Sequence, residues 1–296
     1  MIKRIETLDY LRGLMAFSIL IIHYRTWILV DNSTEPAPFF GALIVYGVSI
    51  FFLLSGATMY LVYNTSFQLS SRYIISFLIK RIFRIFPLLW LVTSLRPIFY
   101  GNIFTIKQYL LTYSGLFAFV DVTKGVARLS WSIGVELVFY SLFPLLIVLL
   151  IRKNNIIFYV LWVLSFCILY YYAFYKLDST KTIVTEGPLY VSPINQFFLF
   201  MAGMVLAYYR STIFKIPNRI ISVVLVISVL LMAFFPIGPD LINIMTGLNR
   251  LFLCFVHDHL CLFHGWQMGI SKTNKKNSVI FRRKILRDLF VTSPCI

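Results

Sequence analysis

The stretch Leu11–Val30 reads LRGLMAFSILIIHYRTWILV, an apolar run of about the length that crosses a bilayer. It carries His23 and, eleven positions earlier, Arg12. At about 100° per residue, eleven positions return to the same helix face about 16 Å further along the axis. A titratable ring inside a membrane span costs free energy and is a functional-site hypothesis. The alternative is a histidine that is hydrogen-bonded within the bundle.

The composition extends this interpretation to the whole chain. The 296 residues are 59% hydrophobic and 13% charged, whereas a soluble domain is roughly 45–50% apolar and roughly 25% charged. About eight runs are long enough to span a bilayer: 11–30, 40–63, 82–100, 131–151, 156–175, 194–209, 219–236 and 241–260. We therefore expect an all-α, polytopic transmembrane helix bundle over residues 1–260, followed by a basic cytoplasmic tail over 261–296.

Basic residues fall between alternate predicted spans and account for the net charge of +16. Lys3 and Arg4 precede the first span, and Arg152 and Lys153 follow the fourth. The positive-inside rule then places the N-terminus in the cytoplasm and the segment 101–130 outside, where it is expected to hold part of an acceptor site. Anionic lipid headgroups explain the basic residues better than nucleic acid does, so we expect membrane lipid as a partner and no nucleic acid.

A basic cluster, Lys80-Arg81-Ile82-Phe83-Arg84, lies shortly before Pro87. Three cations on one helix turn repel one another unless an anion neutralises them, and arginine matches the geometry of phosphate. The cluster therefore suggests a phosphorylated cosubstrate on the cytoplasmic side. Ordinary anchoring at the cytoplasmic face is the alternative, and Pro87 is expected to kink or start the third span.

Glu136 is the one acid among eleven that lies inside a clearly apolar predicted span. A buried carboxylate needs a partner or a raised pKa. His23, an arginine or Tyr140 one turn further on could supply the partner. A carboxylate that orients a histidine base is a recurring catalytic arrangement, and a structural ion pair between helices is the alternative.

Two further sets of residues predict structure rather than chemistry. The small residues in Tyr46-Gly47-Val48-Ser49 and Ser55-Gly56 indicate close helix packing. The four cysteines form no CxxC pair, and His257, His259, Cys261 and His264 fit no standard zinc spacing, so no metal is expected.

Taken in order, these segments over about residues 5–210 resemble the acyltransferase-3 superfamily, the bacterial integral-membrane O-acyltransferases that include O-antigen and exopolysaccharide O-acetylases. The matching residues are Leu8-Asp9-Tyr10-Leu11-Arg12-Gly13 with His23, Phe51-Phe52-Leu53-Leu54-Ser55-Gly56, Lys80-Arg81 with Arg84 and Pro87, Trp131-Ser132 with Glu136, Phe139-Tyr140 and Pro144, and Phe198-Leu199-Phe200-Met201-Ala202-Gly203-Met204.

The resemblance implies a bundle of ten helices in the bacterial inner membrane that passes an acyl group from cytoplasmic acyl-CoA to a hydroxyl of an extracytoplasmic glycan. Acetyl-CoA is the favoured donor. His23 matches the proposed catalytic histidine, and Arg12 matches its paired arginine. Arg81 and Arg84, with Lys80 beside them, match the basic motif linked to the acyl donor. Glu136 matches a family carboxylate.

The chain departs from the family pattern after Leu251, where further spans and a late serine- and tyrosine-rich motif do not appear. We favour a truncated or frame-shifted end over a native tail. Two functional alternatives remain open: a lipid-linked glycan flippase or small-solute transporter, and an inactive acyltransferase remnant.

Overall fold

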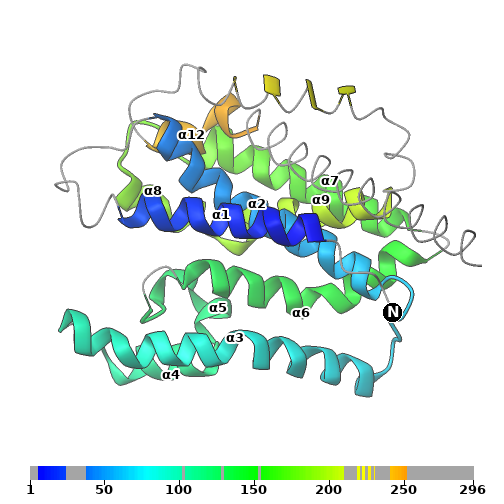
Figure 1. Ribbon diagram of the computed structural model, residues 1–296, viewed down its shortest axis with the longest axis horizontal. Helices are drawn as coiled ribbons and strands as arrows, with labels where there is room; N and C mark the ends of the chain where they lie inside the picture. Colours follow the sequence, from blue (N-terminus) through cyan, green and yellow to red (C-terminus); the bar gives the residue numbers. More distant parts are fainter. Residues whose placement is uncertain are drawn as a thin grey trace, which may run out of the picture.

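The structure is a computed structural model that describes residues 6–24, 38–101, 104–127, 130–152, 155–209 and 241–251, with a few isolated residues between 219 and 230. These described parts are helical and contain no strand, which confirms the all-α prediction. The long helices lie side by side in an elongated bundle (Figure 1). We call the end on the left of Figure 1 the α8 end; α3 begins at the opposite end.

Six long helices and six short elements make up the described chain. The long helices are α1 (Glu6–Tyr24), α2 (Pro38–Tyr63), α3 (Ser71–Tyr100), α6 (Trp131–Ile151), α7 (Ile156–Tyr171) and α9 (Pro193–Tyr208). The short elements are α4 (Ile106–Ser114), α5 (Phe117–Val120), the 3-10 turn η2 (Val122–Lys124), the π-helical turn η3 (Tyr172–Lys176), α8 (Ile183–Tyr190) and α12 (Leu241–Met245).

By length and composition, two of the described helices can cross a membrane: α6, and α7 continued through η3 as Ile156–Lys176. The bent pair α8 and α9, with an angle of 50° between its halves, is a third candidate span. The predicted number of eight spans therefore stays a prediction. The predicted span 219–236 lies largely outside the described residues, as do residues 252–260 of the predicted span 241–260 and the whole tail 261–296.

Helices α2 and α9 form the closest pair in the bundle because each presents a glycine to the backbone of the other. A Cβ atom added to Gly56 would lie 2.0 Å from the carbonyl oxygen of Phe200, and one added to Gly203 would lie 2.0 Å from that of Leu53. No side chain fits between backbones at this distance. The predicted packing role of Ser55-Gly56 is thus confirmed for Gly56.

Buried aromatic rings fill the space between α2, α3, α6 and α9. The ring centroids of Phe139 and Phe200 lie 5.0 Å apart, those of Phe77 and Phe143 lie 5.5 Å apart, and Phe52 meets Phe139 edge-on at 5.5 Å. Offset and edge-to-face contacts of this kind add to the free energy gained by burying the rings. The core therefore fixes α6, and with it Glu136, against α2 and α9.

Helix α3 begins before the predicted span 82–100 and contains all of it. It starts at Ser71, where the Ser70 hydroxyl accepts a hydrogen bond from the Tyr73 amide, and it runs through Pro87 to a left-handed Gly101. Pro87 does not start the helix, because a proline inside a packed helix removes one hydrogen bond without ending it. The basic cluster lies on this helix, as the interpretation of three cations on one helix turn requires.

The segment predicted as a long outer loop, 101–130, contains the short helices α4 and α5 and the turn η2. A capping box starts α4. The backbone N–H of Gln108 donates to the Thr105 hydroxyl, and the backbone N–H of Thr105 donates to the side-chain oxygen Oε1 of Gln108. Phe117 is fully buried and would meet a Cβ added to Gly134 at 2.9 Å. These contacts hold the first turn of α6 in place at the α8 end.

Candidate functional site

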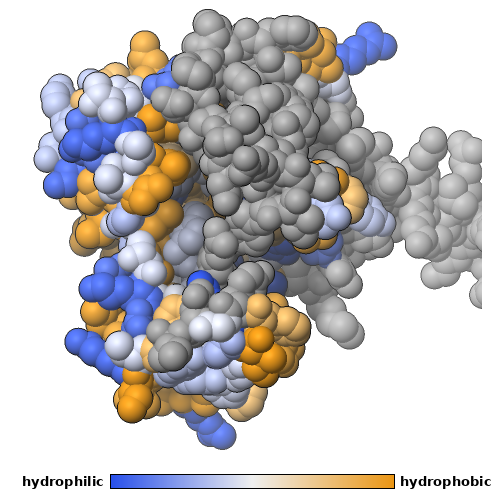
Figure 2. Space-filling model, turned by 90° about the vertical axis from the view of Figure 1, so that its left-hand side faces the viewer, coloured by the Kyte–Doolittle hydropathy of each residue, from blue (hydrophilic) through white to orange (hydrophobic). Residues whose placement is uncertain are grey.

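A cavity of about 500 Å³ opens at the α8 end of the bundle, between α1, α2, α6 and α8. Its lining is mostly apolar and includes His23, Phe52, Trp131, Glu136, Tyr190 and Met245. An apolar cleft with a few titratable groups is the common form of a site for a small substrate. Seen from this end, the surface has hydrophilic residues beside hydrophobic ones (Figure 2).

His23 lies in the last turn of α1 and is partly exposed. Ala16 and Ile19 line the same cavity, so positions 16, 19 and 23 form one helix face that points into it. The prediction that Arg12 and His23 share a face is consistent with the helix that the structure describes from Glu6 to Tyr24. The ring of His23 is thus placed where a substrate in the cavity can reach it.

Glu136 lines the cavity from α6 and is held by Tyr140 one turn further on. The Tyr140 hydroxyl lies 2.9 Å from Glu136 Oε1 and 3.1 Å from Ser55 Oγ. Because the single proton of Tyr140 is donated to the carboxylate, the Ser55 hydroxyl donates to Tyr140. The structure therefore confirms one of the partners predicted for Glu136, and adds Ser55 of α2 as a third member.

Arg81 reaches the same tyrosine from α3. Its guanidinium lies 5.6 Å from the Tyr140 ring centroid and 5.5 Å from that of Tyr63, and Nη2 donates to the Tyr63 hydroxyl at 2.9 Å. Lys80 and Arg84 are exposed on the outer side of the helix. Arg81 is therefore partly buried among the helices, whereas the side chains of Lys80 and Arg84 are exposed and accessible to a ligand.

Arg12 does not line the cavity. Its guanidinium donates to Asp9 Oδ1 at 3.3 Å, to the Leu54 carbonyl oxygen at 3.4 Å and to the Thr58 hydroxyl. Arg84, Tyr140 and Glu136 lie within electrostatic range of it. The structure thus separates the predicted pair. His23 lines the cavity, whereas Arg12 lies among polar groups of α2, α3 and α6, which include Thr58, Arg84 and Tyr140.

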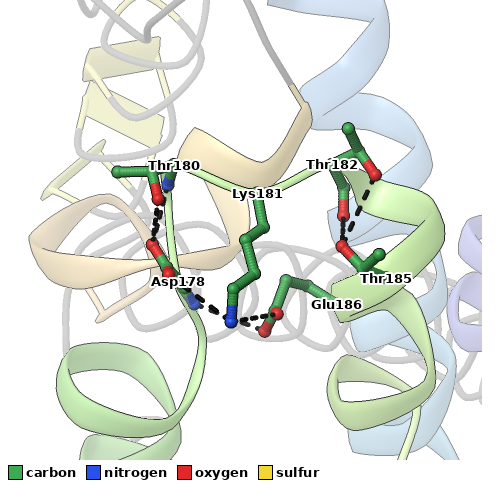
Figure 3. A network of polar contacts seen from close by, with 6 residues as sticks. All are labelled: Asp178, Thr180, Lys181, Thr182, Thr185 and Glu186. Carbon is green, nitrogen blue, oxygen red and sulfur yellow. Dashed lines mark hydrogen bonds and ion pairs between the residues drawn. The ribbon is translucent and has the colours of Figure 1, made fainter.

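A buried acid next to Gly187 of the cavity lining was not singled out from the sequence. Glu186 of α8 is 4% exposed, and its Oε1 lies 3.5 Å from Lys181 Nζ, which also lies 3.5 Å from Asp178 Oδ2. Figure 3 shows Lys181 reaching between the two acids, with Thr180 beside Asp178. The sequence places Glu186 in a loop between two spans, because an eight-residue helix has too short a pattern to be recognised.

A buried arginine stands behind the cavity wall. Arg250 is 0% exposed, its guanidinium lies 4.4 Å from the Tyr190 ring centroid, and Nη2 donates to Gln196 Oε1 at 3.4 Å. Asn195 and Gln196 both donate to the Tyr190 carbonyl oxygen, at 2.8 and 2.7 Å. This network fixes the bend between α8 and α9, and so fixes the Tyr190 ring in the cavity. Its sequence signal is an arginine inside the predicted span 241–260.

The part of the chain that the structure describes contains no group of three histidine, cysteine, aspartate or glutamate side chains arranged to hold a metal ion. His257, His259, Cys261 and His264 lie outside it.

The chain was also compared with known proteins. A family model described as an acyltransferase domain, Acyl_transf_3, matches residues 5–280. No curated protein and no solved structure matches the chain. The matched residues include every segment that the structure describes, from α1 to Arg250 behind the cavity.

Proposed function

The chain belongs to the acyltransferase-3 family and is a membrane acyltransferase, and from this premise we propose that it transfers an acyl group from acyl-CoA to a hydroxyl of a cell-surface polysaccharide. One observation carries the proposal: His23 and Glu136, from two separate helices, line the same cavity of about 500 Å³. A base and a carboxylate beside a space for substrate are the parts that acyl transfer to a hydroxyl needs.

In the proposed reaction, a ring nitrogen of His23 removes the proton of the sugar hydroxyl as its oxygen attacks the thioester carbonyl. The new C–O bond forms, the C–S bond breaks, and the proton passes to the departing CoA thiolate. The same ring can instead attack the thioester itself, so that a C–N bond forms as the C–S bond breaks and CoA leaves as the thiolate. The sugar hydroxyl then attacks the acylated ring, the C–O bond forms as the C–N bond breaks, and the hydroxyl proton passes to the thiolate. The carboxylate of Glu136 stabilises the positive charge that develops on the ring in either route.

The cations of α3 are proposed to hold the phosphates of acyl-CoA, with acetyl-CoA as the favoured donor. Lys80 and Arg84 are exposed and adjacent, and Arg81 contacts Tyr140, the residue that holds Glu136. Phosphate is matched by arginine forks and lysine charges. A donor anchored at these residues would direct its thioester past Tyr140 toward Glu136.

The proposed orientation puts the N-terminus in the cytoplasm and the protein in the bacterial inner membrane. Basic residues before α1 and after α6 support it by the positive-inside rule. The α8 end then faces away from the cytoplasm, so the acceptor enters at the cavity mouth. The family match supports acyl transfer over the flippase or transporter alternative.

The test compares the surface glycans of cells with and without the protein by mass spectrometry. We expect one acyl mass increment, +42 Da if the group is acetyl, that depends on the gene. Membranes given radiolabelled acetyl-CoA should transfer label to the same glycan. An identical acylation pattern in both strains, with the protein present in the membrane, would overturn the proposal.

A further inference from the structure

A second cavity, of about 390 Å³, lies at the same end of the bundle, between the end of α3, α4, η2 and α8. Its lining includes Arg96, Phe104, Gln108, Lys124, Trp131 and Pro188. In contrast to the first cavity, this one combines two cations with an amide, hydroxyls and aromatic rings. No acid is among the described residues that line it.

The two cavities are neighbours. Trp131, Gly187 and Val191 line both of them. Beyond its own helix backbone and chain neighbours, a Cβ atom added to Gly187 would have no atom of the described residues within 4 Å, so the shared wall is open to them at this position. A ligand long enough to occupy the second cavity can therefore extend past Gly187 toward His23 and Glu136.

Two cations, Arg96 and Lys124, line the second cavity. The Arg96 guanidinium lies 5.0 Å from the Phe104 ring centroid, which orients its planar group. Lys124 Nζ lies 3.3 Å from Asp121 Oδ2, and the lysine side chain is 59% exposed. Since that ion pair is exposed, it is weak, and the three N–H donors of Lys124 can serve a ligand as well.

The carboxylate of Asp121 accepts hydrogen bonds from residues of its own turn. Thr123 donates to Asp121 Oδ1 through its amide at 3.0 Å and its hydroxyl at 2.6 Å. Burial opposes ionisation, but these hydrogen bonds and the nearby Lys124 outweigh it and lower the pKa of Asp121. The acid therefore stays ionised beside Lys124, and the cavity itself is lined by Lys124 and Arg96 but not by Asp121.

We propose that this second cavity binds an anionic group of the glycan acceptor, a carboxylate or a phosphate, between Arg96 and Lys124. Trp131 and Phe104 offer flat apolar surfaces to a sugar ring, and the arginine fork matches a two-oxygen anion. The next sugar then lies beside Gly187 with its hydroxyl in the His23 cavity. This inference rests on the proposed function, because it assigns the acceptor class of the same site.

The test measures binding of three disaccharides to the detergent-purified full chain by saturation-transfer NMR titration. Cellobiose is neutral, cellobiouronic acid adds a carboxylate, and cellobiose 1-phosphate adds a phosphate. We expect at least one anionic probe to bind about tenfold more tightly than cellobiose, as a charge-assisted hydrogen bond allows. Comparison of the two anionic probes tells whether the acceptor group is a carboxylate or a phosphate.

Variants then locate the binding. Arg96→Gln and Lys124→Gln should each remove most of the tenfold preference and leave cellobiose binding unchanged. Arg96→Lys should keep part of it, and Lys107→Gln, which removes an exposed cation of α4 outside the cavity, should keep all of it. Melting temperatures close to that of the unaltered protein show that each variant is folded.

Equal affinity for the neutral and anionic probes in the unaltered protein would overturn the inference, as would a preference that survives in both Gln variants. The His23→Ala variant separates this result from the proposed function, because it should bind the anionic probe normally. In the unaltered protein, anionic binding without any acyl transfer overturns the proposed function alone. Acyl transfer without an anionic preference overturns this inference alone.

Discussion

The Tyr140 hydroxyl donates a hydrogen bond to Glu136 Oε1 at 2.9 Å across one turn of α6. The same hydroxyl accepts from Ser55 of α2, and the Arg81 guanidinium lies over the tyrosine ring. Three sequence segments that are far apart in the chain therefore meet at one phenol. Tyr140 couples the position of Glu136 in the cavity to the cations of α3.

Removing this hydroxyl with Tyr140→Phe should release Glu136 and lower acyl transfer about tenfold, since the carboxylate loses the group that orients it. The loss of two buried hydrogen bonds should cost about 1–3 kcal/mol of stability. The matched variant Ser55→Ala removes one hydrogen bond but leaves the one to Glu136, so its activity should fall much less. Transfer assays on both variants check this, and equal loss in the two would assign the effect to packing.

Replacing the proposed base with His23→Ala should lower acyl transfer about 10²–10⁴-fold, the usual contribution of general base catalysis. The protein should still accumulate in the membrane, because the side chain is partly exposed at the end of α1. The neighbouring Tyr24→Phe, at a residue that is 52% exposed, serves as the control and should retain activity. Glycan acylation at the level of the unaltered protein in His23→Ala would exclude His23 from the reaction.

The glycine contacts between α2 and α9 predict a large loss of stability in Gly56→Ala and Gly203→Ala. Each new methyl group would lie 2.0 Å from a backbone oxygen, so the helices must separate, at a cost of about 1–3 kcal/mol. Gly13→Ala is the control, because a Cβ there has no other atom within 4 Å and alanine favours a helix by about 0.5–1 kcal/mol. Thermal unfolding in detergent should lower the melting temperature for the first two variants and raise it for the third.

Closing the shared wall of the two cavities with Gly187→Leu should lower acyl transfer about 10²-fold, because displacement of a substrate by about 1 Å has effects of that size. Stability should change little, since the space beside Gly187 is open. Gly187→Ala is the graded control with a smaller side chain. A leucine variant with normal activity would show that the acceptor does not pass this position.

The loop before α8 should respond to acid. The amide and hydroxyl of Thr180 donate to Asp178 at 2.9 and 2.7 Å, and these bonds, followed by the charge of Lys181, lower the pKa of Asp178. The pKa of Asp178 is thus lower in the folded loop than in the unfolded chain, where it is about 3.9. The ionised carboxylate stabilises the loop at pH values above about 3.9, and this stabilisation is lost as the pH falls through the lower pKa of the folded state.

Hydrogen exchange at the Thr180 amide measures this response. Protection relative to the intrinsic exchange rate should be constant from neutral pH down to about 4 and should fall at lower pH. In Asp178→Ala the protection should be low at every pH, because the acceptor is gone. Protection in the unaltered protein that decreases already between pH 7 and 5 would contradict the assignment to Asp178.

The sequence predicted those parts of the site that depend on helical periodicity alone. The spacing of Glu136 and Tyr140 gives their hydrogen bond once α6 is a helix, and Arg12 and His23 share a face for the same reason. Long apolar runs likewise predicted α2, α6 and α9 closely. The apolar run 82–100 predicted only the second part of α3, because the first part, which begins after the serine cap at Ser70, is more polar than a membrane span.

What the sequence could not provide are contacts between segments that no periodic pattern connects. Glu186 lies on a helix of eight residues, and its burial depends on Lys181 and on the packing of α8 at the cavity rim. The placement of Arg250 over Tyr190 joins residues from two separate elements in the same way. Spacing along the chain carries no information about such contacts, so the second cavity and its neighbours appear only in three dimensions.

The backbone contact between Gly56 and Gly203 also has a consequence for how the protein is made. The residue that covers Gly56 is synthesised long after α2 has left the ribosome, and contacts between distant segments form late in folding. Until α9 is inserted, α2 has no partner for its glycine face, and α6 lacks part of the aromatic core that positions Glu136. Formation of the cavity that Glu136 lines therefore depends on the insertion of α9, the helix that completes both the glycine contact and the aromatic core.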